Sequence, residues 1–237
     1  MIFRSANDHQ NIFMKKLFTP ILFALLLPMG FSCSTLKNYT LNEADAAAAI
    51  RQMLEIGARD GVYGAFSKES IMSALFPEQL RKVLNTLNQL GFTSEIDRFT
   101  TTLATASEKT AERSIPIFVN AISNMKFSDA MRIIKNGGTS ATEYLRSSTG
   151  PQLREAITPV MKTALQEYNL IEQWDKITKP AQAVVGNKFN LDLANLMAGL
   201  VSEKMFQKIE EKEVDIRTNA AARTTGLLQK VFSRDWN

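Results

Sequence analysis

Apolar residues recur along most of the chain at the three- and four-residue spacing that places them on one face of an α-helix. The segment 41–58 is rich in alanine and carries Ile50 and Leu54 at four-residue spacing. A second stripe spans residues 80–90 and stops at Gly91, a natural C-terminal end of a helix. No segment shows the period-two alternation of paired strands, so the pattern predicts an all-α fold.

The middle of the chain carries signals for three more helices. Ser94 is expected to cap a long helix, which Pro116 kinks or divides. Ser128 is expected to cap a short helix that ends at a pair of glycines. Ser140 and Glu143 have the spacing of a capping box, in which Ser140 is the N-cap of the next helix.

Further helices are expected in the C-terminal third. Gly150-Pro151 is expected to begin a new helix, because proline is favoured at a first helical position. Residues 179–190 are expected to form a loop, since they include a proline and a glycine. A long helix is expected over 193–209 and a terminal helix over 220–232. Together the segments predict a single bundle-like helical domain over residues 41–237.

The N-terminal 32 residues are expected to be a signal peptide rather than part of the fold. A short basic stretch that begins at Met14 precedes an apolar run over residues 17–29. This run is too short for a membrane-spanning helix, which needs about 20 apolar residues. Met14 also looks like the true start of translation.

Cys33 directly follows this apolar run and is the only cysteine in the chain. Small residues before a cysteine resemble a lipobox, and Ser32 fits that pattern, whereas Gly30 and Phe31 depart from it. We expect Cys33 to be lipidated, with residues 33–40 as the lipidated cysteine and its tether. The alternative is an ordinary signal peptide cut near Ser32. Lipidation predicts an anchored cell-envelope protein. Ser34 stands where an aspartate retains lipoproteins in the inner membrane of some bacteria, which favours the outer membrane and a domain that faces the periplasm.

The charge balance changes once the signal peptide is removed. The chain has 28 basic and 24 acidic residues, and Arg4, Lys15, Lys16 and Asp8 precede Cys33. The remaining 25 basic and 23 acidic residues give a net charge of about +2, without a long basic block. Nucleic acid is therefore not an expected partner.

The expected mature chain has no histidine, because the single histidine is His9. Catalysis by Ser-His-Asp or Cys-His groups and the common zinc sites are therefore excluded. We expect no cofactor, no metal and no catalytic set, although carboxylate chemistry remains open. A non-enzymatic role is favoured.

A series of short motifs follows at fixed spacing in the middle of the chain. They are Glu108-Lys109-Thr110-Ala111, Ile115-Pro116-Ile117-Phe118, Ala121-Ile122, Met125, Asp129-Ala130, Gly137 and Ala141-Thr142-Glu143-Tyr144-Leu145. This pattern resembles domain-of-unknown-function family 4197 of Gram-negative bacteria. The segments 41–57, 211–219 and 228–232 look like the beginning and end of the same family. The resemblance implies a secreted or lipid-anchored helical domain without an established activity.

Four polar residues fall on this pattern beside apolar stripes: Glu108, Asp129, Glu213 and Arg217. They are a candidate polar cluster at the mouth of a pocket. The alternative, which we favour, is a set of buried ion pairs or caps that fix helix packing.

Three functions remain open from the sequence. The favoured one is a binding or scaffold module that acts on an envelope protein. The second is a carrier or sensor of an apolar ligand such as a lipid. The third is a hydrolase that uses two carboxylates facing each other across a cleft.

Overall fold

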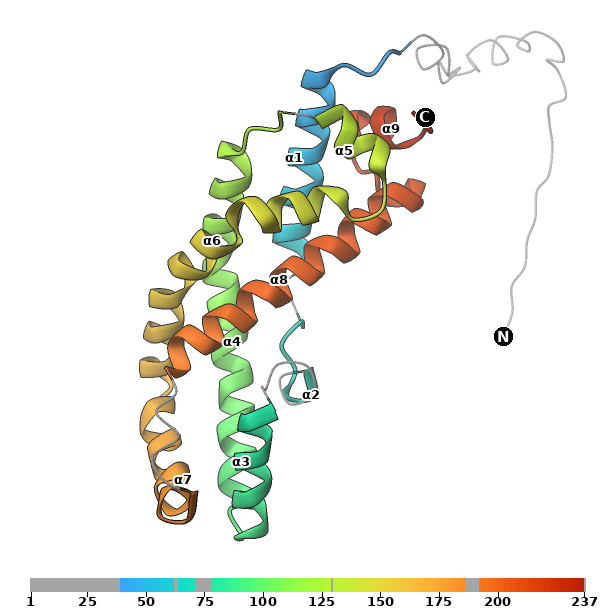
Figure 1. The fold of residues 1–237 in the computed structure, drawn as a ribbon. Helices are drawn as coiled ribbons and strands as arrows, with labels where there is room; N and C mark the ends of the chain where they lie inside the picture. Colours follow the sequence, from blue (N-terminus) through green and yellow to red (C-terminus); the bar gives the residue numbers. More distant parts are fainter. Residues whose placement is uncertain (1–38, 62–63, 71–77, 129, 186–191, 237) are drawn as a thin grey trace, which may run out of the picture. The chain divides into compact units, whose positions relative to one another are not determined.

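Helices make up all the regular structure that the computed structural model describes, which covers residues 39–61, 64–70, 78–128, 130–185 and 192–236 (Figure 1). The predicted all-α fold is confirmed. Cys33 and the expected signal peptide lie outside the described residues. The elements are α1 (Glu43–Asp60), α2 (Lys68–Ser70), α3 (Glu78–Gln89), α4 (Thr93–Asn124), α5 (Ala130–Asn136), α6 (Ser140–Glu167), α7 (Leu170–Val185), α8 (Leu193–Thr218), a 3₁₀ turn (Ala220–Ala222) and α9 (Gly226–Phe232).

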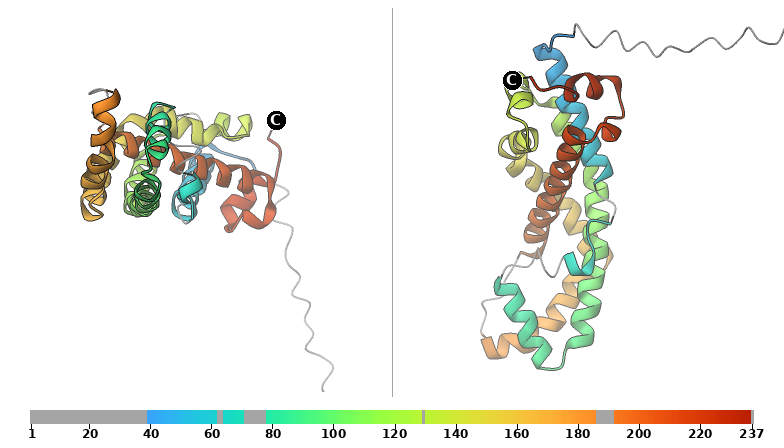
Figure 2. Two further views of the ribbon diagram at one scale, coloured as in Figure 1. Left: turned by 90° about the horizontal axis from the view of Figure 1, so that it is seen from below. Right: turned by 90° about the vertical axis from the view of Figure 1, so that its right-hand side faces the viewer.

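The core lies where α8 crosses α1, α4 and α6 (Figures 1 and 2). Phe118 of α4 and Phe206 of α8 meet edge to face there, with their ring centroids 5.3 Å apart. At the other end of α4, α3 and α7 cover its first turns. The largest fully buried side chains are Phe99, Phe118, Phe206, Ile50, Met53, Leu54, Leu87, Leu103, Ile122 and Leu145.

Two glycines let α1 and α8 approach each other closely. A Cβ atom added to Gly57 would lie 3.0 Å from the Cα of Ile209. One added to Gly61 would lie 2.5 Å from the Cβ of Lys208. Backbone therefore packs against backbone at this crossing, which a larger residue would prevent.

Proline does not interrupt α6, so the prediction of a new helix at Gly150-Pro151 is wrong. The helix runs from Ser140 to Glu167 with Pro151 inside it, and Figure 1 shows that it bends between its two halves. A proline inside a helix costs about 3 kcal/mol. Leu145 and Leu153, on either side of the proline, are both buried. Burying each contributes about 1.5–3 kcal/mol. Because α6 also contains Pro159, the buried Ile157, Met161 and Leu165 near that second proline are needed as well to hold the helix together.

Proline is also tolerated in the next helix. Residues 179–185 belong to α7, so the predicted loop over 179–190 is wrong for that part, and residues 186–191 lie outside the described structure. The proline costs about 3 kcal/mol, and α7 packs against α3, α4 and α6, which offsets that cost. Pro116 lies inside α4 and does not divide it.

Three predicted helix ends also differ from the structure. The N-cap of α4 is Phe92, not Ser94, because the left-handed turn at Gly91 leads directly into the helix. The N-cap of α6 is Thr139, one residue before the predicted Ser140. Residues 220–232 do not form one helix, since Thr225 caps a separate α9 through a hydrogen bond from the backbone N–H of Leu228.

None of the described helices combines the length with the apolar content that a membrane crossing requires.

Candidate functional site

The structure brings together two of the four residues in the predicted polar cluster. Glu213 and Arg217 form an ion pair one turn apart on α8. Glu108 lies elsewhere, where its carboxylate accepts a hydrogen bond of 3.2 Å from the backbone N–H of Gly64. Asp129 lies outside the described residues. The predicted cluster is therefore not a single site.

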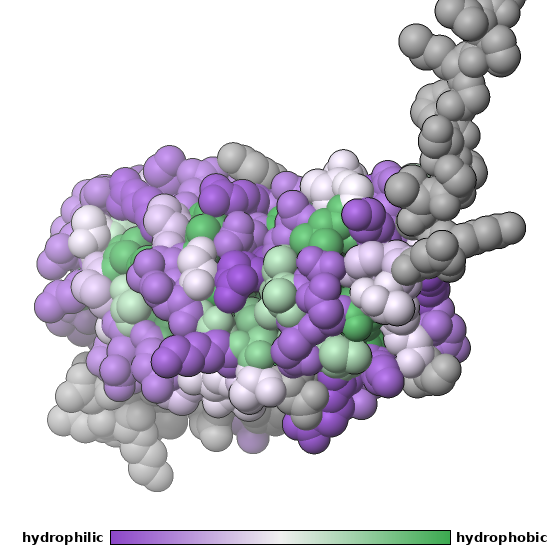
Figure 3. All heavy atoms as spheres, turned by 90° about the horizontal axis from the view of Figure 1, so that it is seen from above, coloured by the Kyte–Doolittle hydropathy of each residue, from purple (hydrophilic) through white to green (hydrophobic). Residues whose placement is uncertain are grey.

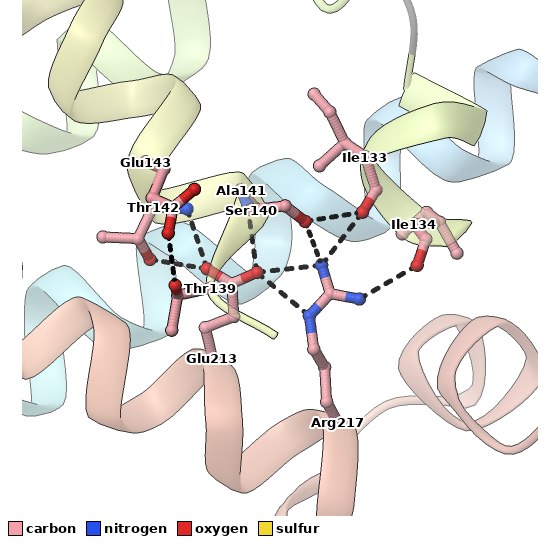
Figure 4. Close-up of polar contacts among 9 residues, drawn as sticks. All are labelled: Ile133, Ile134, Thr139, Ser140, Ala141, Thr142, Glu143, Glu213 and Arg217. Carbon is pink, nitrogen blue, oxygen red and sulfur yellow. Dashed lines mark hydrogen bonds and ion pairs between the residues drawn. The ribbon is translucent and has the colours of Figure 1, made fainter. Parts of the chain in front are cut away.

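The carboxylate of Glu213 caps the N-terminus of α6 from the neighbouring helix (Figure 4). It accepts the backbone N–H of Ala141 at 3.0 Å and that of Thr142 at 2.7 Å. The hydroxyl of Thr142 donates to the same carboxylate at 2.6 Å. An anion at this position satisfies N–H groups that the helix itself leaves without partners, and it complements the helix dipole.

Arg217 joins this carboxylate to the C-terminal end of α5 (Figure 4). Its Nε and Nη2 donate to Oε1 of Glu213 at 3.0 and 2.8 Å. The same guanidinium donates to the carbonyls of Ile134 at 3.2 Å and Ile133 at 3.3 Å. It also lies over the ring of Phe232, 5.2 Å from the centroid. The pair thus links α5, α6, α8 and α9.

The Glu213–Arg217 pair is enclosed by the fold. The side chain of Glu213 is 0% exposed and that of Arg217 is 10% exposed. Both oxygens of the carboxylate accept hydrogen bonds from the chain itself. This geometry supports the interpretation that the pair fixes helix packing, because a ligand could reach the carboxylate only if the helices separated.

A more accessible candidate is the groove between α6 and α8, which has a volume of about 710 Å³. We call it the α6–α8 groove. It combines basic, acidic and apolar side chains from two helices. Its lining residues are Arg146, Gly150, Pro151, Arg154, Glu155, Asn195, Leu196, Gly199, Leu200, Ser202, Glu203 and Phe206.

Arg146 lies at one end of this groove. Its Nη2 pairs with Glu203 at 3.1 Å and with Glu210 at 3.4 Å. The guanidinium lies 5.2 Å from the ring centroid of Phe206, and its buried Nε has no hydrogen-bond partner in the described part of the chain. Arg146 therefore has one buried donor without a partner among the described residues, next to two carboxylates.

Arg154 lies across the other end of the groove. Its Nε donates to the side-chain oxygen of Asn195 at 3.2 Å. A Cβ atom added to Gly199 would lie 3.0 Å from the Arg154 Cζ, so the guanidinium rests on bare backbone. Because Gly199 has no side chain, the groove extends to the backbone of α8 at this position.

The predicted elements do not include this groove, although the chain carries a signal for it. Arg146, Gly150 and Arg154 follow one another at four-residue spacing, which places two cations and a gap on one helical face. The predicted break at Gly150-Pro151 hid this pattern because it assigned the two arginines to different helices.

No group of three or more histidine, cysteine, aspartate or glutamate side chains is placed to hold a metal ion among the described residues.

Comparison with known proteins gives one match. A family model described as "Protein of unknown function (DUF4197)" matches residues 40–233. No curated protein and no solved structure matches the chain. Because the family model covers most of the 237 residues, the chain belongs to the DUF4197 family, as the resemblance in its sequence predicts.

Proposed function

We propose that the protein is a lipid-anchored component of the cell envelope whose helical domain is a non-enzymatic binding module. In this proposal Cys33 carries the lipid in the outer membrane, and the domain faces the periplasm. The domain binds an extended segment of an envelope protein in the α6–α8 groove. The observation that carries the proposal is the groove itself, which charged and apolar side chains from two helices line together.

The charges of the groove favour a protein segment over a polyanion. Arg146 and Arg154 are balanced by Glu155 and Glu203. A nucleic acid or a phosphate-rich glycan would face both carboxylates, whereas a segment with mixed charges can complement each group in turn. Apolar side chains of the segment can pack on the groove's leucines and proline, which are Leu196, Leu200 and Pro151.

The two alternative functions gain less support. The α6–α8 groove is lined by four charged side chains, whereas a lipid carrier needs a mostly apolar cavity. Glu213, a carboxylate of the predicted cluster, is fully buried and cannot contact a substrate of a hydrolase. A binding module remains the function that the geometry supports best.

Site-specific photocrosslinking in living cells tests the groove. A photoreactive phenylalanine analogue at Glu155, an exposed residue of the groove, should give a discrete protein adduct. The matched control places the analogue at Asp175, an exposed residue of α7 away from the groove, and should give none. Gly199→Leu fills the groove and should abolish the adduct. Equal adducts at both positions, or an adduct that Gly199→Leu leaves unchanged, would contradict the proposal.

The anchor is tested separately. Cells grown with radiolabelled fatty acid should label the wild-type protein and not the Cys33→Ala variant. Crosslinking is then compared between the envelopes of both strains. Adducts shared by the two strains would show that the domain itself recognises the partner, whereas adducts lost in Cys33→Ala would show that placement at the membrane is required. An unlabelled wild-type protein would refute the anchor while leaving the groove to its own test.

A further inference from the structure

Both ends of the helical domain meet at one place, beside the tether that leads back to Cys33. Tyr39 and Trp236 meet edge to face, with their ring centroids 5.9 Å apart. Arg234 donates a hydrogen bond of 3.1 Å to the carbonyl of Tyr39. Figure 1 shows the start of α1 and the C-terminus at the same end of the domain. The C-terminal segment therefore holds the point where the tether joins the domain.

The side chains at this point combine aromatic rings with cations. The exposed Lys230 has its Nζ 5.5 Å from the Tyr39 ring centroid, and the Arg234 guanidinium lies 5.7 Å from that of Trp236. Tyrosine and tryptophan are enriched at membrane–water interfaces, and basic side chains are attracted by anionic lipids. We call Tyr39, Lys230, Arg234 and Trp236 the tether-end surface.

The neighbouring acidic groups are largely engaged within the protein. Asp45 accepts the hydroxyl of Tyr39 at 2.6 Å. Glu43 is directed to the backbone N–H groups of Ala130 and Met131, where it caps α5. Asp235 belongs to the same C-terminal segment and also interacts with other residues. The three carboxylates near Lys230 and Arg234 therefore all have partners within the protein.

The length of the tether keeps this surface near a membrane. Tyr39 lies six positions after Cys33, and a fully extended chain over six positions spans at most about 20 Å. A lipid on Cys33 would therefore hold Tyr39 close to the headgroups. Figure 3, which views the structure from above Figure 1, shows apolar residues scattered among hydrophilic ones on that face, a mixture suited to an interface.

We propose that the tether-end surface docks on anionic lipid headgroups and so orients the domain on the membrane that its lipid anchors it to. This inference rests on the proposed lipidation of Cys33. Docking has a consequence for the α6–α8 groove. On α8 the groove runs from Asn195 to Phe206, which lie about 35 and 18 Å along the helix from its C-terminal residue Thr218, the end that leads to α9 and the docked surface. Docking would then hold the groove at a distance from the bilayer.

Tryptophan fluorescence tests the docking, because the chain has two tryptophans in different environments. Trp174 is buried against Phe99, whereas Trp236 belongs to the tether-end surface. The lipidated protein with Trp174→Phe is reconstituted in vesicles of phosphatidylcholine and phosphatidylglycerol with brominated acyl chains. Bromine should quench Trp236 in these vesicles. The lipidated Trp236→Phe protein, which keeps Trp174, should not be quenched.

Charge variants then test the role of the headgroups. Lys230→Glu changes the charge by two units, which should lower the ratio of docked to undocked protein about 25-fold, since each unit near an anionic surface changes it about fivefold. The matched control is Lys162→Glu, at an exposed position of α6, which should leave quenching unchanged. Salt at about 1 M, where the Debye length is about 3 Å, should also reduce quenching.

The outcomes separate this proposal from the anchor. Protein that carries the lipid and floats with the vesicles, but whose Trp236 is not quenched, overturns the docking and leaves the anchor intact. Equal quenching in vesicles of phosphatidylcholine alone also overturns it. A chain whose Cys33 carries no lipid by mass spectrometry refutes the anchor, which is the premise of the docking.

Discussion

Replacing Glu213 by alanine is expected to destabilise the domain by about 3–5 kcal/mol, the usual cost of removing one partner from a buried ion pair. The substitution leaves the backbone N–H groups of Ala141 and Thr142 and the Thr142 hydroxyl without their acceptor. Each buried donor without a partner costs about 1–3 kcal/mol. Arg217, at 10% exposure, also loses its counterion. The loss should be smaller than the sum of these separate costs, because Arg217 and the first turn of α6 can shift toward water.

Urea unfolding of the unlipidated mature chain, followed by far-UV circular dichroism, measures this loss. Thermal unfolding gives a second measure: a domain of this size loses about 2–4 °C of Tm per kcal/mol, so Tm should decrease by about 6–20 °C. The matched control is Glu211→Ala, whose side chain is 60% exposed and pairs with Lys208. It should change stability by less than about 0.5 kcal/mol. A loss below about 1 kcal/mol for Glu213→Ala would refute the assigned role.

A double-mutant cycle shows whether Glu213 and Arg217 act together. Arg217→Ala alone leaves the carboxylate buried beside the N–H groups of α6, whereas the double variant removes both charges. The double variant should lose less stability than the two single losses added, by about 0.5–3 kcal/mol. Strictly additive losses would show that the two side chains stabilise the fold independently.

Three further substitutions or titrations probe other parts of the fold. Gly57→Val should lower the free energy of unfolding in urea by about 1–3 kcal/mol, because the added Cβ would lie 3.0 Å from the Cα of Ile209. An unchanged urea midpoint would contradict the close crossing of α1 and α8. Gly91→Ala should lower the free energy of unfolding by about 1 kcal/mol through backbone strain alone, since φ is +90° and no atom lies within 4 Å of an added Cβ. An unchanged stability would contradict the left-handed turn at this residue. Burial, followed by the hydrogen bond to Asp45, raises the pKa of Tyr39 from 10.0 to about 12. Ultraviolet titration should therefore show one of the four tyrosines ionising near pH 12. The contribution of the neutral Tyr39 hydroxyl to the free energy of unfolding should be complete below pH 10 and lost as the pH rises to about 12.

The helices themselves follow from local patterns in the sequence. The stripes that contain Ile50 and Leu54, or Leu84 and Leu87, are buried in the structure as their spacing predicts. The turn at Gly91 was also predictable, because glycine adopts positive φ without strain. These features depend on residues within one or two turns of each other, which is the range that periodicity reports.

Contacts between distant residues were not predictable from the same patterns. Ser140 was expected to cap α6, but Glu213, more than seventy residues later, accepts the N–H groups of the first turn. Glu43 similarly caps α5 from α1. The continuity of α6 through Pro151 depends on packing against α4 and α8, which no local rule contains. The groove was missed for the same reason, since its two walls come from different parts of the chain.

The same long-range caps bear on how the α6–α8 groove would bind. Glu213 fixes the first turn of α6 to α8, and Arg146 joins the two helices again through Glu203 and Glu210. Both walls of the groove are thereby held relative to each other before any ligand arrives. A preformed groove loses little conformational entropy on binding, so affinity should depend mainly on its charges. Glu203→Gln, which weakens one link of Arg146 and removes a groove charge, should therefore reduce the crosslink at Glu155 without a loss of stability above about 1 kcal/mol. Loss of the crosslink together with a large loss of stability would instead show that the groove depends on this ion pair for its shape.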